Sequence, residues 1–232
     1  GSMDEKSGMN FSEYVAILSG NTDLLDKAKL EKQIVGLESE KQAFNRSKSS
    51  AKFKVQDYTE MLQSTQSRLN RMSTDWANLQ QRLQKRSDGT IENPVLLDGL
   101  PPNANPKQIG AKLNEIADKA RTAGLYEEIG SLYGFTLLVK TEMSEKEGVD
   151  IRENRFLVQG EGNIKYTYNN GLIAKDEKLA AFNFLNALEK LPVYVVQEQK
   201  KIAEIQKDLP VLQEVINGTW SKESRLSELK TE

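Results

Sequence analysis

The 232-residue sequence contains neither cysteine nor histidine, and both absences limit its chemistry. Without cysteine there are no disulfides and no thiolate metal sites, which is neutral to weakly favourable for a cytoplasmic origin. Without histidine the chain lacks the usual general base, the usual metal ligand and the usual pH switch. Serine and threonine hydroxyls then have no imidazole to activate them. We therefore expect no catalytic residue, no metal site and no cofactor, and an enzyme is the least favoured class of function.

Long apolar runs are also missing. No stretch approaches the ~18 residues that a membrane-spanning helix needs, so we expect no membrane partner. Hydrophobic residues make up 38% and charged residues 28% of the chain, and the mean hydropathy is −0.60, which is typical of extended helices with solvated faces. The net charge of −2 gives no overall field that would attract nucleic acid or membrane.

Both ends of the sequence predict a piece cut from a longer polypeptide. Gly1, Ser2 and Met3 resemble a vector-derived remnant and do not enter the fold reasoning. Residues 226–232 (LSELKTE) stop inside a helical pattern without a capping residue. The rest of the parent polypeptide is therefore an expected partner.

The first segment, residues 10–21, predicts a short amphipathic helix over 11–18 followed by a turn. Gly20 suits the left-handed conformation that closes a helix. Thr22 or Asp23 can then cap a second helix.

Residues 22–87 predict one long helix, because apolar side chains recur at alternating steps of four and three. Thirteen of sixteen such seam positions are apolar or Tyr, the interval contains no proline, and Gly36 is its only glycine. This repeat favours a left-handed supercoil against a partner helix, over roughly 100 Å at ~1.5 Å per residue. The seam positions are Leu30, Ile34, Leu37, Lys41, Phe44, Lys48, Ala51, Val55, Tyr58, Leu62, Thr65, Leu69, Met72, Trp76, Leu79 and Leu83.

Lys41 and Lys48 interrupt the apolar seam. One interpretation is a loosened coil whose lysines extend out to solvent. The other is a hinge or contact point built into the helix.

Residues 176–232 predict the return arm. Pro192 suits a helix start, whereas Pro210 should kink or restart the helix. Pairing Leu83 near Val195 would bring the chain end near Arg46, which leaves the earlier part of the first helix without a partner. Three solutions stand: a longer return helix in the parent, the 11–18 helix folding back, or a homodimer through the unpaired first arm. The return seam runs through Val195, Glu198, Ile202, Ile205, Leu209, Leu212, Ile216 and Thr219.

Between the arms, residues 88–175 hold four of the six prolines and ten of the fifteen glycines, which indicates a turn-rich domain. We expect a small antiparallel sheet, covered by residues 175–191. The predicted elements are a strand and turn at 93–99, a helix from 105 to 124, a buried strand at 135–143, and a hairpin of strands 155–159 and 164–168. The predicted fold class is α+β, mainly α: a long antiparallel helical hairpin, a coiled coil, with a small α+β domain inserted at its tip.

Two short motifs carry little chemistry. Gly160-Glu161-Gly162 lacks the third glycine of a dinucleotide loop, and a hairpin turn explains it. The acidic groups are Glu127-Glu128 and a cluster at 142–150, and their spacing fits no calcium loop, so we expect a solvated acidic loop.

A basic stretch of the first helix is the candidate site. Between residues 41 and 86, ten basic residues stand against three acids, a local balance of +7. Such a helix can follow a phosphate backbone without regard to sequence. The alternative is a solvated face complementary to acids of the return arm, namely Glu198, Glu204, Asp208 and Glu214. The candidate nucleic-acid contacts are Lys41, Arg46, Lys48, Lys52, Lys54, Arg68, Arg71, Arg82, Lys85 and Arg86.

Aromatic side chains of the domain have two interpretations as well. They can stack on bases, or they can be core residues and cross-strand pairs. The residues concerned are Tyr126, Tyr133, Phe135, Tyr166 and Tyr168.

Residues 11–27 (FSEYVAILSGNTDLLDK) resemble a segment of very large proteins of bacterial mobile elements and phages. These proteins join an N-6 adenine DNA methyltransferase region to a Swi/Snf-type helicase, and they include the phage defence-against-restriction proteins. Residues 97–99, 109–116 and 129–135 are similar to the domain that follows in that family. The resemblance implies a coiled-coil region after the second helicase lobe. The family's Asn-Pro-Pro-Tyr-type and Walker-type loops do not occur here, so no catalytic residue is carried over.

Two hypotheses follow. The first is a non-catalytic accessory arm of a DNA helicase and adenine methylase polypeptide, which contacts DNA or positions a partner. The second is a structural coiled-coil spacer or dimerisation module that binds no nucleic acid. Salt-sensitive DNA binding separates them.

Overall fold

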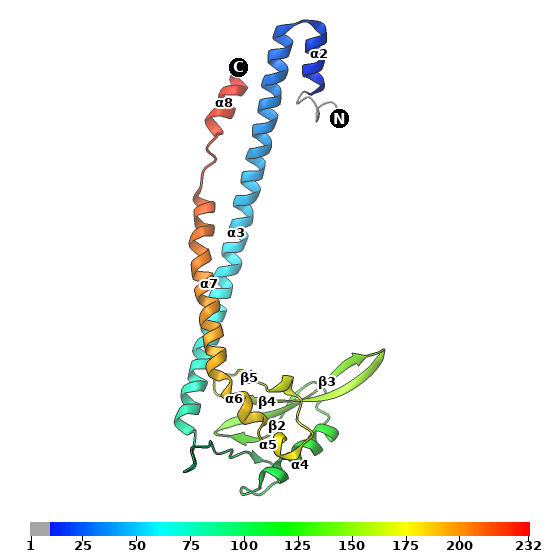
Figure 1. The fold of residues 1–232 in the computed structure, drawn as a ribbon, viewed down its shortest axis with the longest axis vertical. Helices are drawn as coiled ribbons and strands as arrows, with labels where there is room; N and C mark the ends of the chain where they lie inside the picture. Colours follow the sequence, from blue (N-terminus) through cyan, green and yellow to red (C-terminus); the bar gives the residue numbers. More distant parts are fainter. Residues whose placement is uncertain (1–9) are drawn as a thin grey trace. The chain divides into compact units, whose positions relative to one another are not determined.

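The computed structural model describes residues 10–232, and the chain forms two units. We call the chain up to Met61 together with Glu204–Glu232 the helical unit, and Leu62–Ala203 the sheet unit. Two helices, α3 (Thr22–Arg82) and α7 (Leu191–Asn217), contribute to both units. Figure 1 labels the elements. Helices predominate and there is one small antiparallel sheet, which confirms the predicted class, α+β and mainly α.

In the helical unit, α2 (Phe11–Ser19) folds back onto the start of α3. Its turn uses Gly20 at a φ of 69°, as the sequence predicted. The Glu13 carboxylate lies 3.4 Å from Lys32 Nζ, and Ala16 is buried. Of the three solutions for the start of the first helix, the structure contains this fold-back.

The N-terminal cap of α3 differs from the prediction. Asn21 Oδ1 accepts hydrogen bonds from the backbone N–H groups of Asp23 at 3.0 Å and Leu24 at 3.2 Å. The cap is therefore Asn21, one residue before Thr22 and two before Asp23, the two predicted caps. An Asn side chain is among the best acceptors for the unpaired N–H groups of a first turn.

α3 has the buried stripe that its seven-residue pattern predicted. All sixteen seam positions are buried or half-buried, including Lys41 and Lys48. The helix is 61 residues long and ends at Arg82, before the predicted Ser87. It ends early because the chain that follows turns back on itself, and the Arg86 N–H donates to the Thr90 carbonyl at 2.8 Å.

α7 does not restart at Pro210, which was one of the two predicted effects of this proline. The helix continues through this residue and ends only at Asn217, followed by α8 (Glu223–Thr231). Pro210 removes one backbone bond, but it is exposed, so water can bind the carbonyl that loses its partner. Pro192 lies in the first turn, where its missing N–H costs nothing.

The register between the return arm and α3 also differs from the prediction. With Leu83 near Val195, Gly218 would lie near Glu60. Instead, the Gly218 carbonyl accepts a hydrogen bond from Lys48 Nζ at 3.0 Å. The shift arises because the chain before α7 folds into the sheet unit and does not extend the return helix.

α8 pairs with the part of α3 for which the sequence predicted no partner within the chain. Lys230 Nζ lies 3.0 Å from Glu38, and Lys222 Nζ lies 2.8 Å from Glu40. Partners within the chain therefore reach well beyond Arg46, the predicted limit.

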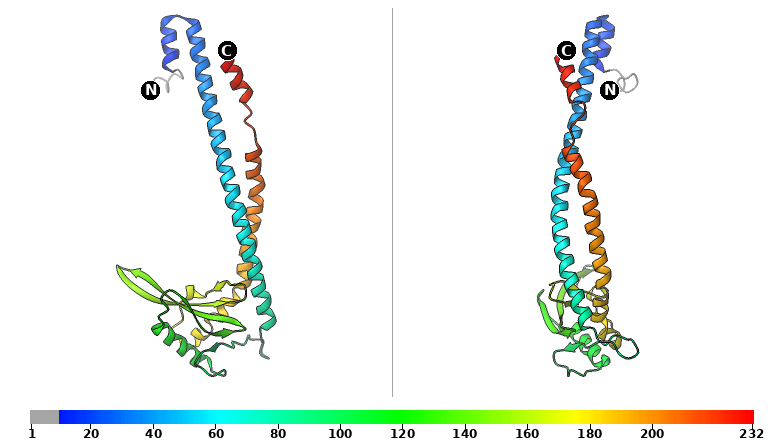
Figure 2. Two further views of the ribbon diagram at one scale, coloured as in Figure 1. Left: turned by 180° about the vertical axis from the view of Figure 1, so that it is seen from behind. Right: turned by 90° about the vertical axis from the view of Figure 1, so that its left-hand side faces the viewer.

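The sheet unit contains a five-stranded antiparallel sheet in the order β1-β2-β3-β4-β5 (Figures 1 and 2). Every strand pairs with its neighbour in sequence. The strands are β1 (Leu96–Leu97), β2 (Tyr126–Leu132), β3 (Phe135–Lys146), β4 (Val149–Gln159) and β5 (Lys165–Tyr166). The helical elements are α4 (Pro106–Lys119), η1 (Asn169–Gly171), α5 (Glu177–Ala181) and α6 (Asn183–Glu189).

The core of this unit forms between one face of the sheet and the helices. Alternate residues of β3 and β4 point into it, as the period of two requires. The end of α3 contributes to the same core. Its most buried members include Leu113, Leu137, Val139, Val158, Leu188, Met72 and Leu79.

α4 begins as predicted and ends earlier. Asn105 and Gln108 form a reciprocal capping box ahead of Pro106. The helix stops at Lys119 rather than near Gly124, and the Asn154 amide donates to carbonyls of its last turn, for example to that of Ala117 at 2.8 Å.

The acidic residues lie mostly in strands and not in the predicted loop, although they are solvated as predicted. β2 contains Glu127 and Glu128, and the cluster at 142–150 belongs to the β3–β4 hairpin. A register shift between Glu128 and Gly130 breaks the alternation of β2, which hid the strand in the sequence. The hairpin is hidden for another reason: both faces of its outer end are solvated, so its side chains carry the polarity of a loop.

Candidate nucleic-acid interface

The ten predicted basic residues fall into two sets. Five are bound to other parts of the chain, and five are exposed with no hydrogen bond or ion pair from their side chains to any of residues 10–232. The bound set is Lys41, Lys48, Arg68, Arg71 and Arg82. The exposed set is Arg46, Lys52, Lys54, Lys85 and Arg86.

Lys41 and Lys48 are contact points of the helical unit. Lys41 Nζ lies 2.8 Å from the Glu223 carboxylate and 6.0 Å from the ring centre of Trp220. Lys48 binds the carbonyl of Gly218. Both lysines thus hold the chain between α7 and α8, in line with the second interpretation of these seam positions.

Two arginines of α3, Arg71 and Arg82, attach this helix to the loop between β4 and β5. Arg71 donates to the Gly162 carbonyl at 3.3 Å. Arg82 lies 3.0 Å from the Glu161 carboxylate and donates to the Tyr133 carbonyl at 3.2 Å. The guanidinium groups of Arg71 and Arg82 therefore stabilise the fold and already have partners within the chain.

Arg68 pairs with an acid of the return arm, as the alternative interpretation expected. Its Nε lies 3.7 Å from Glu198, whose carboxylate is largely buried. The other three acids named there, Glu204, Asp208 and Glu214, are exposed and form no ion pair with α3 among the described residues. Of the four acids named there, only Glu198 thus binds one of the ten cations, but Glu223 of α8, also in the return arm, binds Lys41.

Asp75 is a buried carboxylate that sequence reasoning did not single out. It is 0% exposed. It accepts hydrogen bonds from the Tyr166 hydroxyl at 2.7 Å and from the Gly162 N–H at 2.9 Å. A carboxylate on α3 thereby holds β5 and the loop before it. We call Asp75, Gly162 and Tyr166 the Asp75 latch.

Two glycines allow this close approach. A Cβ at Gly160 would lie 2.4 Å from Asp75 Oδ1, and a Cβ at Gly162 would lie 2.6 Å from the Arg71 carbonyl. The Gly160-Glu161-Gly162 motif therefore serves docking against a helix, and its glycines need no phosphate to explain them.

The latch raises the pKa of Tyr166. Burial of the phenol is the main cause, followed by its hydrogen bond to Asp75 and the negative charge of that carboxylate. The tyrosine stays protonated in the folded protein where a free tyrosine would ionise.

The five aromatic residues also fall into two sets, one buried and one exposed. Tyr133, Phe135 and Tyr166 are buried, as core residues. Tyr126 and Tyr168 remain 45% and 38% exposed. Each of these two rings lies beside lysine ammonium groups, with Lys165 Nζ 4.5 Å from the Tyr126 ring centre.

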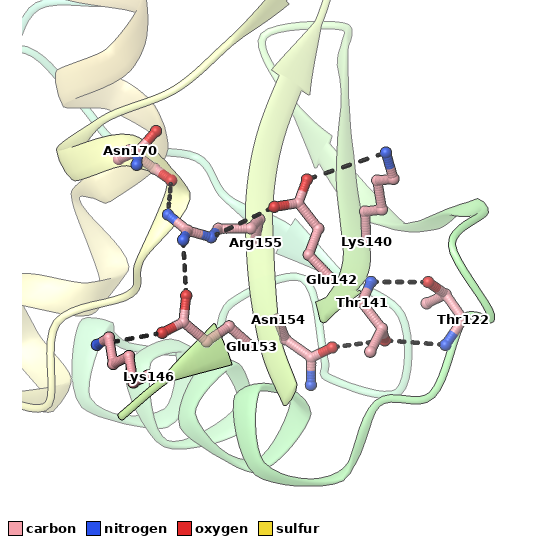
Figure 3. A network of polar contacts seen from close by, with 9 residues as sticks. All are labelled: Thr122, Lys140, Thr141, Glu142, Lys146, Glu153, Asn154, Arg155 and Asn170. Carbon is pink, nitrogen blue, oxygen red and sulfur yellow. Dashed lines mark hydrogen bonds and ion pairs between the residues drawn. The ribbon is translucent and has the colours of Figure 1, made fainter. Parts of the chain in front are cut away.

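Glu142 of the acidic cluster and Glu153, which lies outside it, belong to a network of ion pairs on the β3–β4 hairpin (Figure 3). Arg155 lies at its centre, 2.6 Å from Glu153 and 3.7 Å from Glu142. Lys146 and Lys140 pair with the same two carboxylates. Among residues 10–232 no group of three or more ligating side chains is positioned to hold a metal ion.

Residues 80–188 match a family described as a domain of unknown function (DUF8438). The matched segment lies within the sheet unit and contains the whole sheet. No curated protein and no solved structure matches the chain. No helix in the described part of the chain has both the length and the apolar composition to cross a membrane.

Proposed function

We propose that this chain is a non-catalytic accessory arm of a DNA helicase and adenine methylase polypeptide, and that it contacts DNA. In this proposal α3 and the return arm form an antiparallel coiled coil that carries the sheet domain. All sixteen seam positions, fifteen of them in α3, are buried or half-buried, which supports the coiled coil. The return seam is likewise buried or half-buried from Val195 to Ile216.

The exposed basic set carries the DNA part of the proposal. Arg46, Lys52 and Lys54 lie within nine residues of α3, and no acid among residues 10–232 neutralises them. Unpaired surface cations can bind phosphates and release the counterions of DNA without first breaking an ion pair or hydrogen bond of the protein. The bound basic set would first have to give up its internal partners.

Charge reversal tests the proposal. We expect the triple variant Arg46→Glu, Lys52→Glu, Lys54→Glu to weaken binding to a fluorescent DNA duplex at least tenfold at ~50 mM salt. The slope of log affinity against log salt should fall by about 0.9 for each DNA phosphate that the variant no longer neutralises. Fluorescence anisotropy over a salt series measures both.

The matched control reverses the same number of exposed lysines in the sheet unit, at Lys107, Lys175 and Lys178. It changes the net charge equally, so it should bind DNA much as the wild type does. If both variants lost the same DNA affinity, the loss would be an effect of net charge and not of the exposed basic set. The proposal fails if the wild type shows no binding at ~50 mM salt.

A second candidate function, a dimerisation module, has its own supporting observation. α2 is apolar almost all round, yet only Glu13 and Ala16 are buried, while Phe11 and Leu18 are 76% and 69% exposed. A helix of this composition is normally covered on several sides.

Sedimentation velocity over a concentration series distinguishes this function from the first. It predicts a dimer that the double variant Phe11→Ser, Leu18→Ser dissociates, because the apolar surface is removed. The control is Phe53→Ser, which removes an equally exposed ring from α3 (70% exposed). A monomer at every concentration would count against dimerisation.

A further inference from the structure

One edge of β3 is left without a neighbouring strand. β2 begins at Tyr126, opposite Lys140, whereas β3 continues to Lys146. β4 accompanies β3 on its other side to the end of the hairpin. Figures 1 and 2 show the two strands extending past the rest of the sheet as a ribbon. The last part of β3 therefore has one paired edge and one open edge.

The direction of the Thr141 N–H shows which residues of β3 direct their backbone groups to the open edge. Its N–H points away from β4 and donates to Thr122 Oγ1 at 2.8 Å, while its hydroxyl receives the Thr122 N–H at 2.9 Å (Figure 3). Successive backbone groups of a strand alternate in direction. Met143 and Glu145 thus direct their N–H and C=O groups to the same side as Thr141. No described residue outside the sheet pairs with them.

A concavity of about 750 Å³ adjoins this edge. Its charged lining is mainly positive, with Arg121, Lys140 and Arg152 against Glu142. Met143 adds an apolar side chain that is 61% exposed. The edge thus offers main-chain partners and an apolar contact, and the groove beside it carries an excess of positive charge.

We propose that this edge binds an extended acidic segment of a partner protein, which adds to the sheet as a strand beside β3. Added strands gain affinity from main-chain hydrogen bonds and specificity from alternate side chains. Arg152 is paired opposite Met143, so the two side chains share one face of the ribbon. An acidic residue of the bound segment opposite Met143 would therefore lie on the same face as Arg152, and Arg121 also lines the groove.

The outer part of β3 and its turn carry Glu142, Glu145 and Glu147 against one lysine, Lys146. The positive charge that favours an acidic segment therefore comes from Arg121 and Arg152 in the groove and not from the outer part of β3. Pairing with the same edge of a second copy would instead produce a dimer, which the test below detects. The proposal uses none of the cations invoked for DNA binding, so either can fail alone.

The test uses a fluorescent octapeptide of alternating Glu and Val, and a matched peptide in which Lys replaces Glu. We expect the acidic peptide to bind the full chain, and the Lys peptide to bind at least tenfold more weakly. Arg152→Glu should weaken the acidic peptide about tenfold. N-methylation of every second peptide nitrogen should abolish binding in one register and spare it in the other, because only one set of N–H groups faces β3.

The Met143→Pro variant tests the open edge from the side of the protein. Proline removes the N–H at the open edge and is tolerated on edge strands, and Met143→Ala keeps that N–H as the control. Thermal melts establish that both variants fold. Loss of peptide binding in Met143→Pro alone supports the proposal. It is overturned if both N-methylated peptides bind equally, if Met143→Pro binds as the wild type does, or if the edge instead mediates a dimer that Met143→Pro abolishes.

Discussion

Asp75→Ala is expected to lower the free energy of unfolding of the sheet unit by about 3 kcal/mol or more. The substitution leaves the Tyr166 hydroxyl and the Gly162 N–H without an acceptor in a site that water does not reach. Each buried group left unpaired costs about 1–3 kcal/mol. Truncation of the fully buried side chain adds a cavity to this loss.

Urea unfolding followed by tryptophan fluorescence measures this change. The chain has two tryptophans, and in a Trp220→Phe background only Trp76 reports, next to Asp75 in the sheet unit. Asp57→Ala is the matched control, because Asp57 is an exposed aspartate on the same helix. The control should change stability by no more than about 0.5 kcal/mol. A loss below about 1 kcal/mol in Asp75→Ala would contradict the role of the latch.

Because of the Asp75 latch, we expect the stability of the sheet unit to depend on pH in the alkaline range. Tyr166 has a raised pKa in the folded protein, whereas an unfolded tyrosine ionises near pH ~10. The folded chain therefore binds the extra proton, so the stability is fully present below pH ~10 and is lost as the pH rises above it. In Asp75→Ala, where one cause of the shift is gone, this loss should be smaller than in the wild type.

Periodicity predicted the long elements of this fold well, and for a physical reason. A helix of 61 residues repeats its core contact every turn, so even Lys41, Lys48 and Thr65 did not conceal the seam. The strand β3 was readable in the same way, because its inner residues alternate from Phe135 to Thr141.

Register was not predictable, because it depends on contacts between distant segments. The path of α5 and α6 into the sheet unit decides where α7 meets α3, and neither helix has a strong period of its own. β2 was missed because its bulge interrupts the alternation. In each case the information lies in tertiary packing rather than in the local pattern.

The candidate site shows the same limit. All ten cations were visible in the sequence, but the groups that bind five of them lie far along the chain, such as Gly162 for Arg71 and Glu223 for Lys41. Asp75 lies beside a seam position, where a charged residue ordinarily faces solvent. Its role depends on the Gly160-Glu161-Gly162 loop, and no local signal connects the two.

Gly110→Ala should destabilise the sheet unit by about 3 kcal/mol or more, although alanine is the better helix former. In α4 a Cβ at Gly110 would lie 1.7 Å from the backbone carbonyl oxygen of Glu177, at the start of α5. The atom it meets is main chain, so no side-chain rotation relieves the overlap. α4 and α5 would have to separate and expose part of the core, which includes Leu113 and Ala181.

Gly36→Ala is the control that makes the sign of this effect decisive. Gly36 also lies inside a helix, and a Cβ there meets nothing within 4 Å. Helix propensity alone then predicts a gain of about 0.5–1 kcal/mol at both glycines. We expect that gain at Gly36, followed by circular dichroism in urea, and a loss at Gly110, followed by Trp76 fluorescence. Gains at both positions would mean that α4 and α5 are not in main-chain contact, because only that contact opposes the propensity of alanine at Gly110.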